Sequence, residues 1–225
     1  LYPNRVAWRA QARNEMSESK PTVFLVDDDA AFLKAIDRLL RSSGYVTECF
    51  SSANEFLAQR RAGLAGCALV DLRMPDMDGM ALQRALAESA NPLPVVFLTG
   101  QGDIPSSVAA MRRGAEDFLV KTSPKAVVIA AIERALARDA RERDQRARRH
   151  DQQSRFETLT PRERQVLSQV MQGRLNKQIA ADLGIDERSV KRHRTHLMRK
   201  LEVKSVAELA QLAVELGFGT SDSVE

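Results

Sequence analysis

The stretch LVDLRMPDMDG, residues 69–79, places a carboxylate directly after a run of apolar residues. Ala68, Leu69 and Val70 are typical of a strand that is buried on both faces of a parallel sheet. Asp71 should therefore emerge where this strand leaves the core and enters a loop. Because ligands collect at that edge of open α/β sheets, the stretch predicts a functional carboxylate at the carboxyl end of a strand.

Further β-type runs flank this stretch and alternate with amphipathic segments such as residues 30–40, whose apolar side chains share one helical face. Alternation of strand and helix five times indicates an α/β fold with a five-stranded parallel sheet and helices on both faces. The second and fifth strands should lie at its edges. The expected strands are TVFLV (22–26), YVTECF (45–50), CALV (67–70), PVVFLT (94–99) and DFLVK (117–121).

Polar side chains follow most of these strands. Right-handed crossovers bring the carboxyl ends of parallel strands to one edge of the sheet, so carboxylates, a hydroxyl and an ammonium should converge there. Asp29 is the expected N-cap of the next helix. The converging residues are Asp27, Asp28, Asp71, Thr99 and Lys121.

Crowded carboxylates repel one another unless a cation joins them, and a hard divalent ion, Mg²⁺ or Mn²⁺, suits oxygen ligands. The expected ligands are Asp28, Asp71 and the backbone carbonyl of Arg73. Asp27 would hold the water shell of the ion. A free oxygen of Asp71 could then attack a phosphoryl group in line.

The motifs VDDD, LVDLRMPDMDG, FLTG and DFLVK, in this order, resemble the receiver domain of two-component response regulators. The resemblance implies a flavodoxin-like fold that is phosphorylated by a partner histidine kinase. It assigns roles to Asp71 (phosphoacceptor), Asp27 and Asp28 (acidic pocket), Thr99 and Lys121 (switch and phosphate binding) and Phe118 (aromatic switch). The GQGDIP stretch, residues 100–105, is similar to the FixJ-type subgroup.

One position departs from the receiver pattern. Thr122 follows Lys121 where the family usually has Pro, joined by a cis bond. A cis peptide bond before a residue other than Pro is about 3 kcal/mol less stable than the trans bond. The sequence therefore leaves open the geometry of this joint and the position of the Lys121 amine.

The length of 225 residues and a hydrophobic content of 44% allow two domains. No apolar span approaches about 18 residues and no signal-like segment opens the chain, so we expect a cytoplasmic protein without membrane contact. Residues 1–19 are the expected disordered or vector-derived tail, and residues 20–137 the receiver domain. Cys49 and Cys67 fit no metal or redox spacing and are expected to be small buried residues.

Charge is spread unevenly along the chain. Residues 20–137 carry 13 Lys and Arg against 14 Asp and Glu, whereas residues 155–215 carry 12 against 8. The back half is therefore expected to meet a polyanion. Between the two parts, residues 124–149 predict a helix that packs on the receiver and continues as a charged segment. Residues 138–154 are the expected helical linker, which should be a solvated helix rather than a DNA-binding arm.

Residues 155–219 predict an all-α helix-turn-helix domain. Thr160 is an expected N-cap, with Glu163 completing a capping box, and Asp186 caps the third helix. Gly173 and Gly184 should end the first and second helices. A fourth helix over residues 205–216 should turn inward Val206, Leu209, Ala210 and Leu212 or Ala213.

The third of these helices, residues 187–201, has two faces. Val190, Leu197 and Leu201 predict a core face, and the opposite cationic stripe suits the major groove and phosphates of double-stranded DNA. Through TPRE, NKQIA, SVKRH and a late KL, the segment resembles the LuxR or NarL type of DNA-binding domain. That resemblance implies base contacts from Lys191, Arg192 and Thr195, and phosphate contacts from Lys177, Arg188, Ser189 and Lys200.

Together the motifs are typical of a FixJ/NarL-type response regulator. Phosphorylation of Asp71 would remodel the receiver surface around residues 104–120, and a homodimer would bind paired half-sites. Only self-phosphorylation and self-dephosphorylation are expected as catalysis. Two alternatives stay open: an aspartyl-phosphate phosphohydrolase using Asp27 and Asp29, which leaves Asp71 unexplained, and a phosphate-independent DNA-binding regulator, which the Lys121–Thr122 joint allows.

Overall fold

The computed structural model describes residues 20–61, 63–100 and 104–216. The chain divides into two compact units between Glu142 and Arg143, each with its own core. The tail expected over residues 1–19 lies outside the described residues, as do residues 101–103 of the GQGDIP stretch and residues 217–219 at the end of the expected DNA-binding domain. The expected limits of the linker, residues 138–154, remain a prediction.

The first unit is built on a parallel sheet of five strands in the order β2-β1-β3-β4-β5. The predicted edge positions of β2 and β5 are confirmed, and every strand lies within one residue of its expected bounds. The strands are β1 (Thr22–Val26), β2 (Val46–Phe50), β3 (Gly66–Val70), β4 (Val95–Thr99) and β5 (Asp117–Val120). Between β1 and β3 the strand order reverses, which is where open α/β sheets bind ligands.

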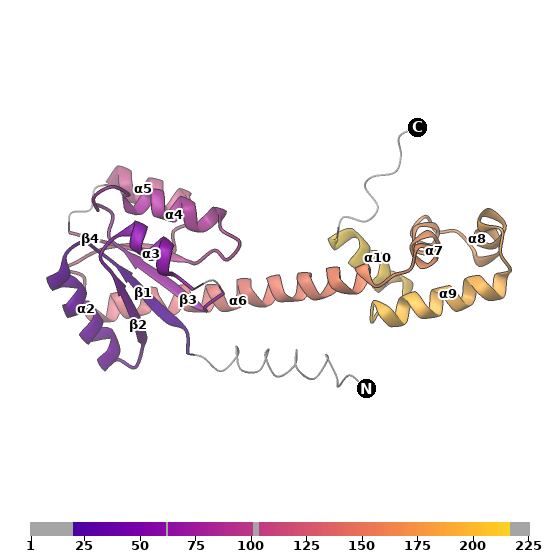
Figure 1. Ribbon diagram of the computed structural model, residues 1–225, viewed down its shortest axis with the longest axis horizontal. Coiled ribbons are helices and arrows are strands. Elements are labelled where there is room, and N and C mark those ends of the chain that lie inside the picture. The colour runs from indigo at the N-terminus through magenta and orange to yellow at the C-terminus, as the bar shows by residue number, and fades with distance from the viewer. Residues whose placement is uncertain (1–19, 62, 101–103, 217–225) are drawn as a thin grey trace. The chain divides into compact units, whose positions relative to one another are not determined.

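Helices cover both faces of this sheet, as predicted (Figure 1). Leu33 and Ile36 of α2 (Ala30–Ser42) and Ile132 of α6 (Lys125–Glu157) share a buried cluster with one face of the sheet. On the other face, Phe56 and Leu82 pack against aromatic and aliphatic side chains of the strands. The elements on this second face are α3 (Ala53–Gln59), α4 (Gly79–Glu88) and α5 (Ile104–Arg112).

The helix α6 is tied to the amino edge of the sheet, away from the predicted site. Asp139 is 2% exposed, and its Oδ2 accepts a hydrogen bond from the backbone of Gly66, the first residue of β3, at 2.9 Å. Arg138 donates to the carbonyl of Gly114 at 3.0 Å, and Arg134 pairs with Asp117 at the start of β5. These contacts fix the register of α6 against the strands.

The second unit contains α7 (Pro161–Met171), α8 (Asn176–Leu183), α9 (Glu187–Lys200) and α10 (Val206–Glu215). The capping box of Thr160 and Glu163 is confirmed, with Pro161 in the first helical position. Gly184 adopts a left-handed conformation with φ 64°, which ends α8 and turns the chain toward α9. The core collects apolar residues from all four helices and from Phe156 and Leu159 before them.

Two sequence expectations about burial are wrong. Val206 is 43% exposed because Ser205 caps α10, so Val206 opens the first turn while Leu209 and Leu212 face the core. Cys67 is fully buried as expected, but Cys49, on the edge strand β2, is exposed. Among the described residues, none of the helices combines the length and the apolar character needed to cross a bilayer.

Candidate functional site

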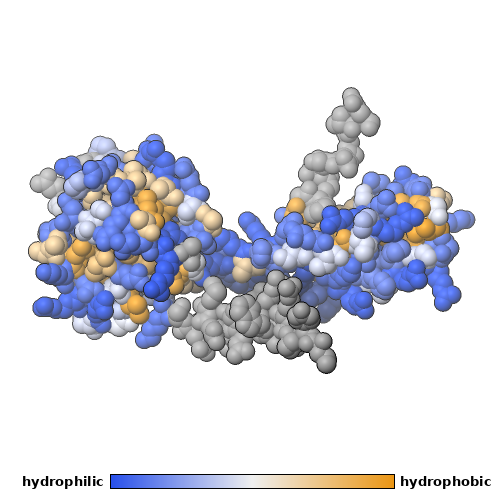
Figure 2. All heavy atoms as spheres, viewed as in Figure 1, coloured by the Kyte–Doolittle hydropathy of each residue, from blue (hydrophilic) through white to orange (hydrophobic). Residues whose placement is uncertain are grey.

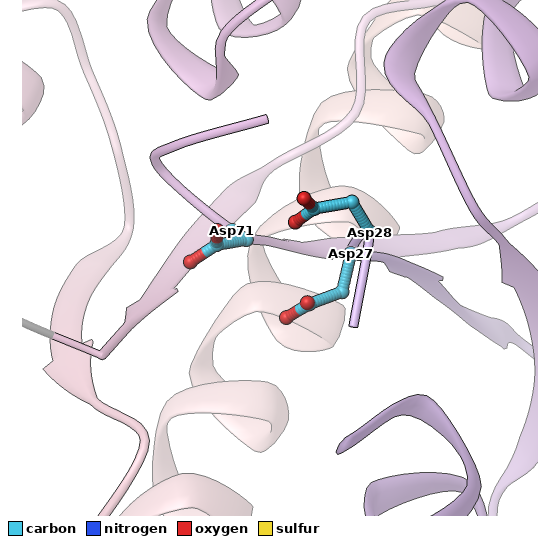
Figure 3. A group of neighbouring side chains, drawn as sticks. All are labelled: Asp27, Asp28 and Asp71. Atoms are coloured by element: carbon cyan, nitrogen blue, oxygen red, sulfur yellow. The ribbon is translucent and has the colours of Figure 1, made fainter. Parts of the chain in front are cut away.

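The carboxylates after β1 and β3 meet at the carboxyl edge of the sheet (Figure 3). Val26 and Val70 are register partners, so Asp27 and Asp71, one residue later, are also neighbours. The backbone N–H of Asp71 donates to the Val26 carbonyl at 2.8 Å, which extends the ladder to the site. The pairing of two neighbouring strands therefore positions these two side chains.

The three predicted carboxylates form one cluster that could hold a metal ion. One oxygen each from Asp27, Asp28 and Asp71 lies within 4.8 Å of the others. Asp27 is 3% exposed and Asp71 6%, whereas Asp28 is exposed. Hard oxygen donors at this spacing, open to solvent on one side, fit a divalent cation that keeps part of its water shell.

Lys121 supplies a positive charge to the same cluster. Its Nζ lies 2.6 Å from Asp27 Oδ2 and 3.6 Å from Asp71 Oδ1. The backbone N–H of Lys121 donates to the Thr99 carbonyl at 2.7 Å, so β4 positions the segment that carries the amine. The described residues contain no cis peptide bond, so the Lys121–Thr122 joint is trans and the amine nevertheless reaches both carboxylates.

The environment of Asp71 makes its carboxyl group harder to ionise than an ordinary aspartate. Burial raises the pKa of this carboxyl, and the nearby charge of Asp27 raises it further. The Lys121 ammonium and the backbone N–H groups of Leu72 and Arg73 act in the opposite direction, but they do not cancel the effect of burial. A second cation entering the cluster would lower the pKa of Asp71 and favour the ionised form.

The loop after Asp71 packs tightly against it. Asp71 Oδ2 accepts a hydrogen bond from the Arg73 backbone at 3.3 Å. Gly79 donates its backbone N–H to Leu72, and a Cβ on Gly79 would lie 2.4 Å from the Asp71 carbonyl oxygen. Asp78 caps α4 by accepting from Ala81. The loop therefore returns directly over the strand end, and only glycine fits at that return.

Thr99 and Phe118, the two predicted switch residues, lie on neighbouring strands. Thr99 is the last residue of β4 and is 1% exposed. Phe118 is half-buried and its ring centroid lies 5.9 Å from that of Phe97, tilted by 46°. The Phe118 ring is thus packed at the edge of the core, partly open to solvent.

Phe32 is a residue of this site that sequence reasoning assigned only to the apolar face of a helix. Its ring centroid lies 4.5 Å from Lys121 Nζ. Asp29, confirmed as the N-cap of α2, accepts from the backbone of Ala31 and Phe32. The sequence feature that could have indicated this position is that Phe32 lies in the first turn of the helix that follows the acidic strand end.

In the second unit the predicted base-contacting residues share the exposed face of α9. Lys191, Arg192 and Thr195 are exposed, whereas Val190 and Leu197 are buried. Arg188 and Lys177 are also exposed. On the face of this unit that Figure 2 shows, hydrophilic residues predominate. The arrangement presents cationic side chains to solvent from one side of the helix.

Two of the predicted phosphate contacts are engaged inside the protein. Ser189 Oγ donates to Asp186 Oδ2 at 2.6 Å, within the cap of α9. Lys200 Nζ lies 2.7 Å from Glu163 Oε2 and donates to the Thr158 carbonyl at 3.0 Å. The structure therefore gives both side chains a role in holding α9, and their contact with phosphate remains a prediction.

Comparison with known proteins bears on both units. Residues 23–133 match the response regulator receiver domain family, and residues 157–213 match the family described as bacterial regulatory proteins, luxR family. The chain is 38% identical to the response regulator protein TodT of Pseudomonas putida F1, over all of this chain and 97% of that protein. The chain is a response regulator.

Other similar proteins cover most of this response regulator. The transcriptional regulatory protein FixJ of Rhizobium meliloti is 41% identical over 204 residues, which is 89% of this chain and 98% of that protein. A low-resolution structure of the response regulator StyR, 43% identical, matches with a TM-score of 0.78 over 88% of this chain and all of that chain. The receiver and the LuxR-type domain together make the protein a transcriptional regulator rather than an enzyme by family.

Proposed function

We propose that Asp71 accepts a phosphoryl group from a partner histidine kinase and that this modification controls DNA binding by the second unit. The observation that supports the proposal is that Asp71 lies beside two other carboxylates and 3.6 Å from the Lys121 ammonium. A nucleophilic oxygen, acidic side chains and a cation within reach of it are the groups that phosphoryl transfer to a carboxylate requires.

Asp28, Asp71 and the Arg73 carbonyl would hold Mg²⁺, or Mn²⁺, with Asp27 at its water shell. The ion supplies charge neutralisation between the acidic cluster and an incoming phosphoryl group. Asp71 then attacks the phosphorus through a carboxylate oxygen as the bond to the leaving group of the donor breaks. Lys121 and Thr99 bind the transferred oxygens, the former by its ammonium and the latter by its hydroxyl.

The receiver surface from residue 104 to residue 120 is the proposed dimer contact, with Phe118 as the switch beside it. Three apolar side chains on this surface support the proposal, because Val108, Met111 and Val120 are 44%, 48% and 40% exposed. A homodimer would present two copies of α9 to paired half-sites in DNA. Its base contacts would be Lys191, Arg192 and Thr195, and its phosphate contacts Lys177, Arg188, Ser189 and Lys200.

The modification is tested by incubating the full chain with acetyl phosphate, with and without Mg²⁺, and measuring the phosphorylated fraction by intact mass. We expect labelling that requires Mg²⁺ and disappears in Asp71→Asn. Asp76→Asn is the matched control because Asp76 is an exposed aspartate in the same loop and should label normally. Labelling of Asp71→Asn at the wild-type level would refute the assignment.

The regulatory part of the proposal is tested on DNA. A footprint on genomic fragments, repeated with and without acetyl phosphate, identifies the bound sites. We expect the phosphodonor to tighten binding by the wild type and to leave Asp71→Asn unchanged. Equal binding by the wild type in both conditions would instead favour a regulator that acts without phosphate.

A further inference from the structure

We propose that Phe32 is a positioning residue for phosphoryl transfer, acting through Lys121 by holding the lysine ammonium against the face of its ring. The inference rests on the proposed function of Asp71. The contact that motivates it is the distance of 4.5 Å between Lys121 Nζ and the centroid of the Phe32 ring. A cation within about 6 Å of a ring face is attracted by its negative electrostatic potential.

The position of the ring is set independently of the lysine. Asp29 caps α2 and accepts from the Phe32 backbone at 3.1 Å, which fixes the first turn of the helix. The ring is half-buried and packs against the cluster that contains Leu33 and Ile36. It also lines a small pocket together with both Asp27 and Asp71. The fold therefore fixes the Phe32 ring at one side of the site.

Among the described residues, the ring adds a contact of another kind to an ammonium that Asp27 and Asp71 also hold. Asp27 lies on one side of Lys121 at 2.6 Å and Asp71 at 3.6 Å. The lysine side chain is only 18% exposed, so its donors face these groups rather than bulk water. An ammonium fixed only by Asp27 would have to leave that partner to reach a phosphoryl oxygen near Asp71.

Phe32 limits the directions in which the ammonium can move. The ring attracts the charge without accepting a directed hydrogen bond, so the three N–H donors stay available for carboxylate or phosphoryl oxygens. The amine can therefore exchange Asp27 for a phosphoryl oxygen while keeping its contact with the ring. This preorganisation should raise the rate of transfer rather than the stability of the fold.

The first test compares Phe32→Leu with Phe32→Tyr in the full chain. Replacing the ring by Leu should slow labelling by acetyl phosphate at saturating Mg²⁺ by roughly 3- to 10-fold, with the loss in the maximal rate rather than in the donor KM. Phe32→Tyr keeps the aromatic face and should label at close to the wild-type rate. Thermal unfolding of each variant reports any separate effect on the fold.

A double-mutant cycle shows whether Phe32 acts through Lys121. In a Lys121→Ala background, Phe32→Leu should cause no further loss of rate, because the cation that the ring holds is absent. An undiminished loss in that background would assign the effect of Phe32 to packing and overturn the proposal. The wild type and Asp71→Asn measured alongside separate this result from a failure of phosphorylation itself.

A second readout does not depend on activity. Protons on the ε-carbon of a lysine over an aromatic face shift upfield in the NMR spectrum, and Lys121→Arg identifies the signal. We expect the upfield signal in the wild type and in Phe32→Tyr, and its return to the usual position in Phe32→Leu. A Lys121 signal at the usual position in the wild type would overturn the proposal even if Phe32→Leu did not fold.

Discussion

Asp71 is buried to a degree that is unusual for a carboxylate that must ionise to react. Its charge is tolerated because the Lys121 ammonium and the Arg73 backbone N–H lie beside it, although burial still raises its pKa. The ionised form of Asp71 therefore has a higher free energy, relative to its protonated form, than that of a surface carboxylate. Such a group is more basic and more nucleophilic, and a cation entering the cluster relieves its repulsion with Asp27.

The raised pKa predicts a pH-dependent effect of Asp71→Asn on stability. A carboxyl whose pKa is raised in the folded state contributes stability below its ordinary value of 3.8 and loses it as the pH rises through the raised pKa. Near pH 7.5 the neutral amide should therefore raise the free energy of unfolding of the first unit by about 1 kcal/mol.

Urea unfolding with a chelator present measures this gain. It should shrink as the pH is lowered through the raised pKa of Asp71, because the wild-type carboxyl takes up a proton and becomes neutral. A gain that stayed constant with pH would show that the charge of Asp71 is not its source.

Gly79 is a second position at which a single added carbon atom would disturb the site. A Cβ there would meet the Asp71 carbonyl oxygen at 2.4 Å, so Gly79→Ala must displace backbone. We expect a loss of about 2–3 kcal/mol in the free energy of unfolding and slower labelling of Asp71. Gly100→Ala is the control for stability, since no described residue beyond its chain neighbours lies within 4 Å of a Cβ at Gly100. Equal stability of the two variants would contradict this reading of the loop.

Among the elements, α9 is held at its carboxyl end by an ion pair with a buried carboxylate. Glu163 is 4% exposed, and Lys200 joins it to the last turn of α9. Burial alone would raise the pKa of Glu163, but hydrogen bonds from Lys200 and Thr160 together lower it. The stability that this carboxylate contributes is therefore present above its ordinary pKa of 4.5 and is lost as the pH falls through the lowered value.

Removing the lysine tests this attachment. Lys200→Met leaves a buried carboxylate without its cation and should lower the free energy of unfolding of the second unit by about 2 kcal/mol. Lys191→Met, on the exposed face of the same helix, should change it by less than about 0.5 kcal/mol. Chemical unfolding followed by helical circular dichroism measures both. If the two variants proved equally stable, the ion pair would not be what holds α9.

The sequence predicted these elements well because their signals are local. Strand bounds followed from short apolar runs, and the caps Asp29, Thr160 and Asp186 followed from side chains that bind their own helix. Helix ends were less accurate. The helical segment expected to end at residue 154 continues to Glu157, and Phe156 beside that end packs in the second core.

Contacts between distant residues that do not follow from the sheet topology were not predictable from a single sequence. Phe32 has the spacing of a core residue, and nothing nearby indicates that Lys121 lies over its ring. Lys200 has the positive charge expected of a phosphate contact, but the fold brings it next to Glu163, which is distant in sequence. The proximity of Asp27 and Asp71 was predictable because parallel topology places strand ends at one edge, whatever the loops do.

At the scale of the whole molecule, the separate cores predict separate unfolding. The clusters on the two faces of the sheet contain residues of the first unit only, and the third cluster contains residues of the second. Calorimetry of the full chain should therefore show two transitions. Gly79→Ala should lower the melting temperature of one, and Lys200→Met that of the other. A single transition shifted by both substitutions would show that the units unfold together.

The contacts of Lys121 with Asp27 and Asp71 also bear on the state of the receiver before phosphorylation. Since Lys121 already balances part of the negative charge, we expect the receiver to keep its fold without a bound ion. If phosphorylation of Asp71 requires Mg²⁺ as we propose, a cell with little free magnesium would hold an intact but unresponsive regulator until the ion returned. Starvation for the metal would then silence the pathway without destroying the protein that carries it.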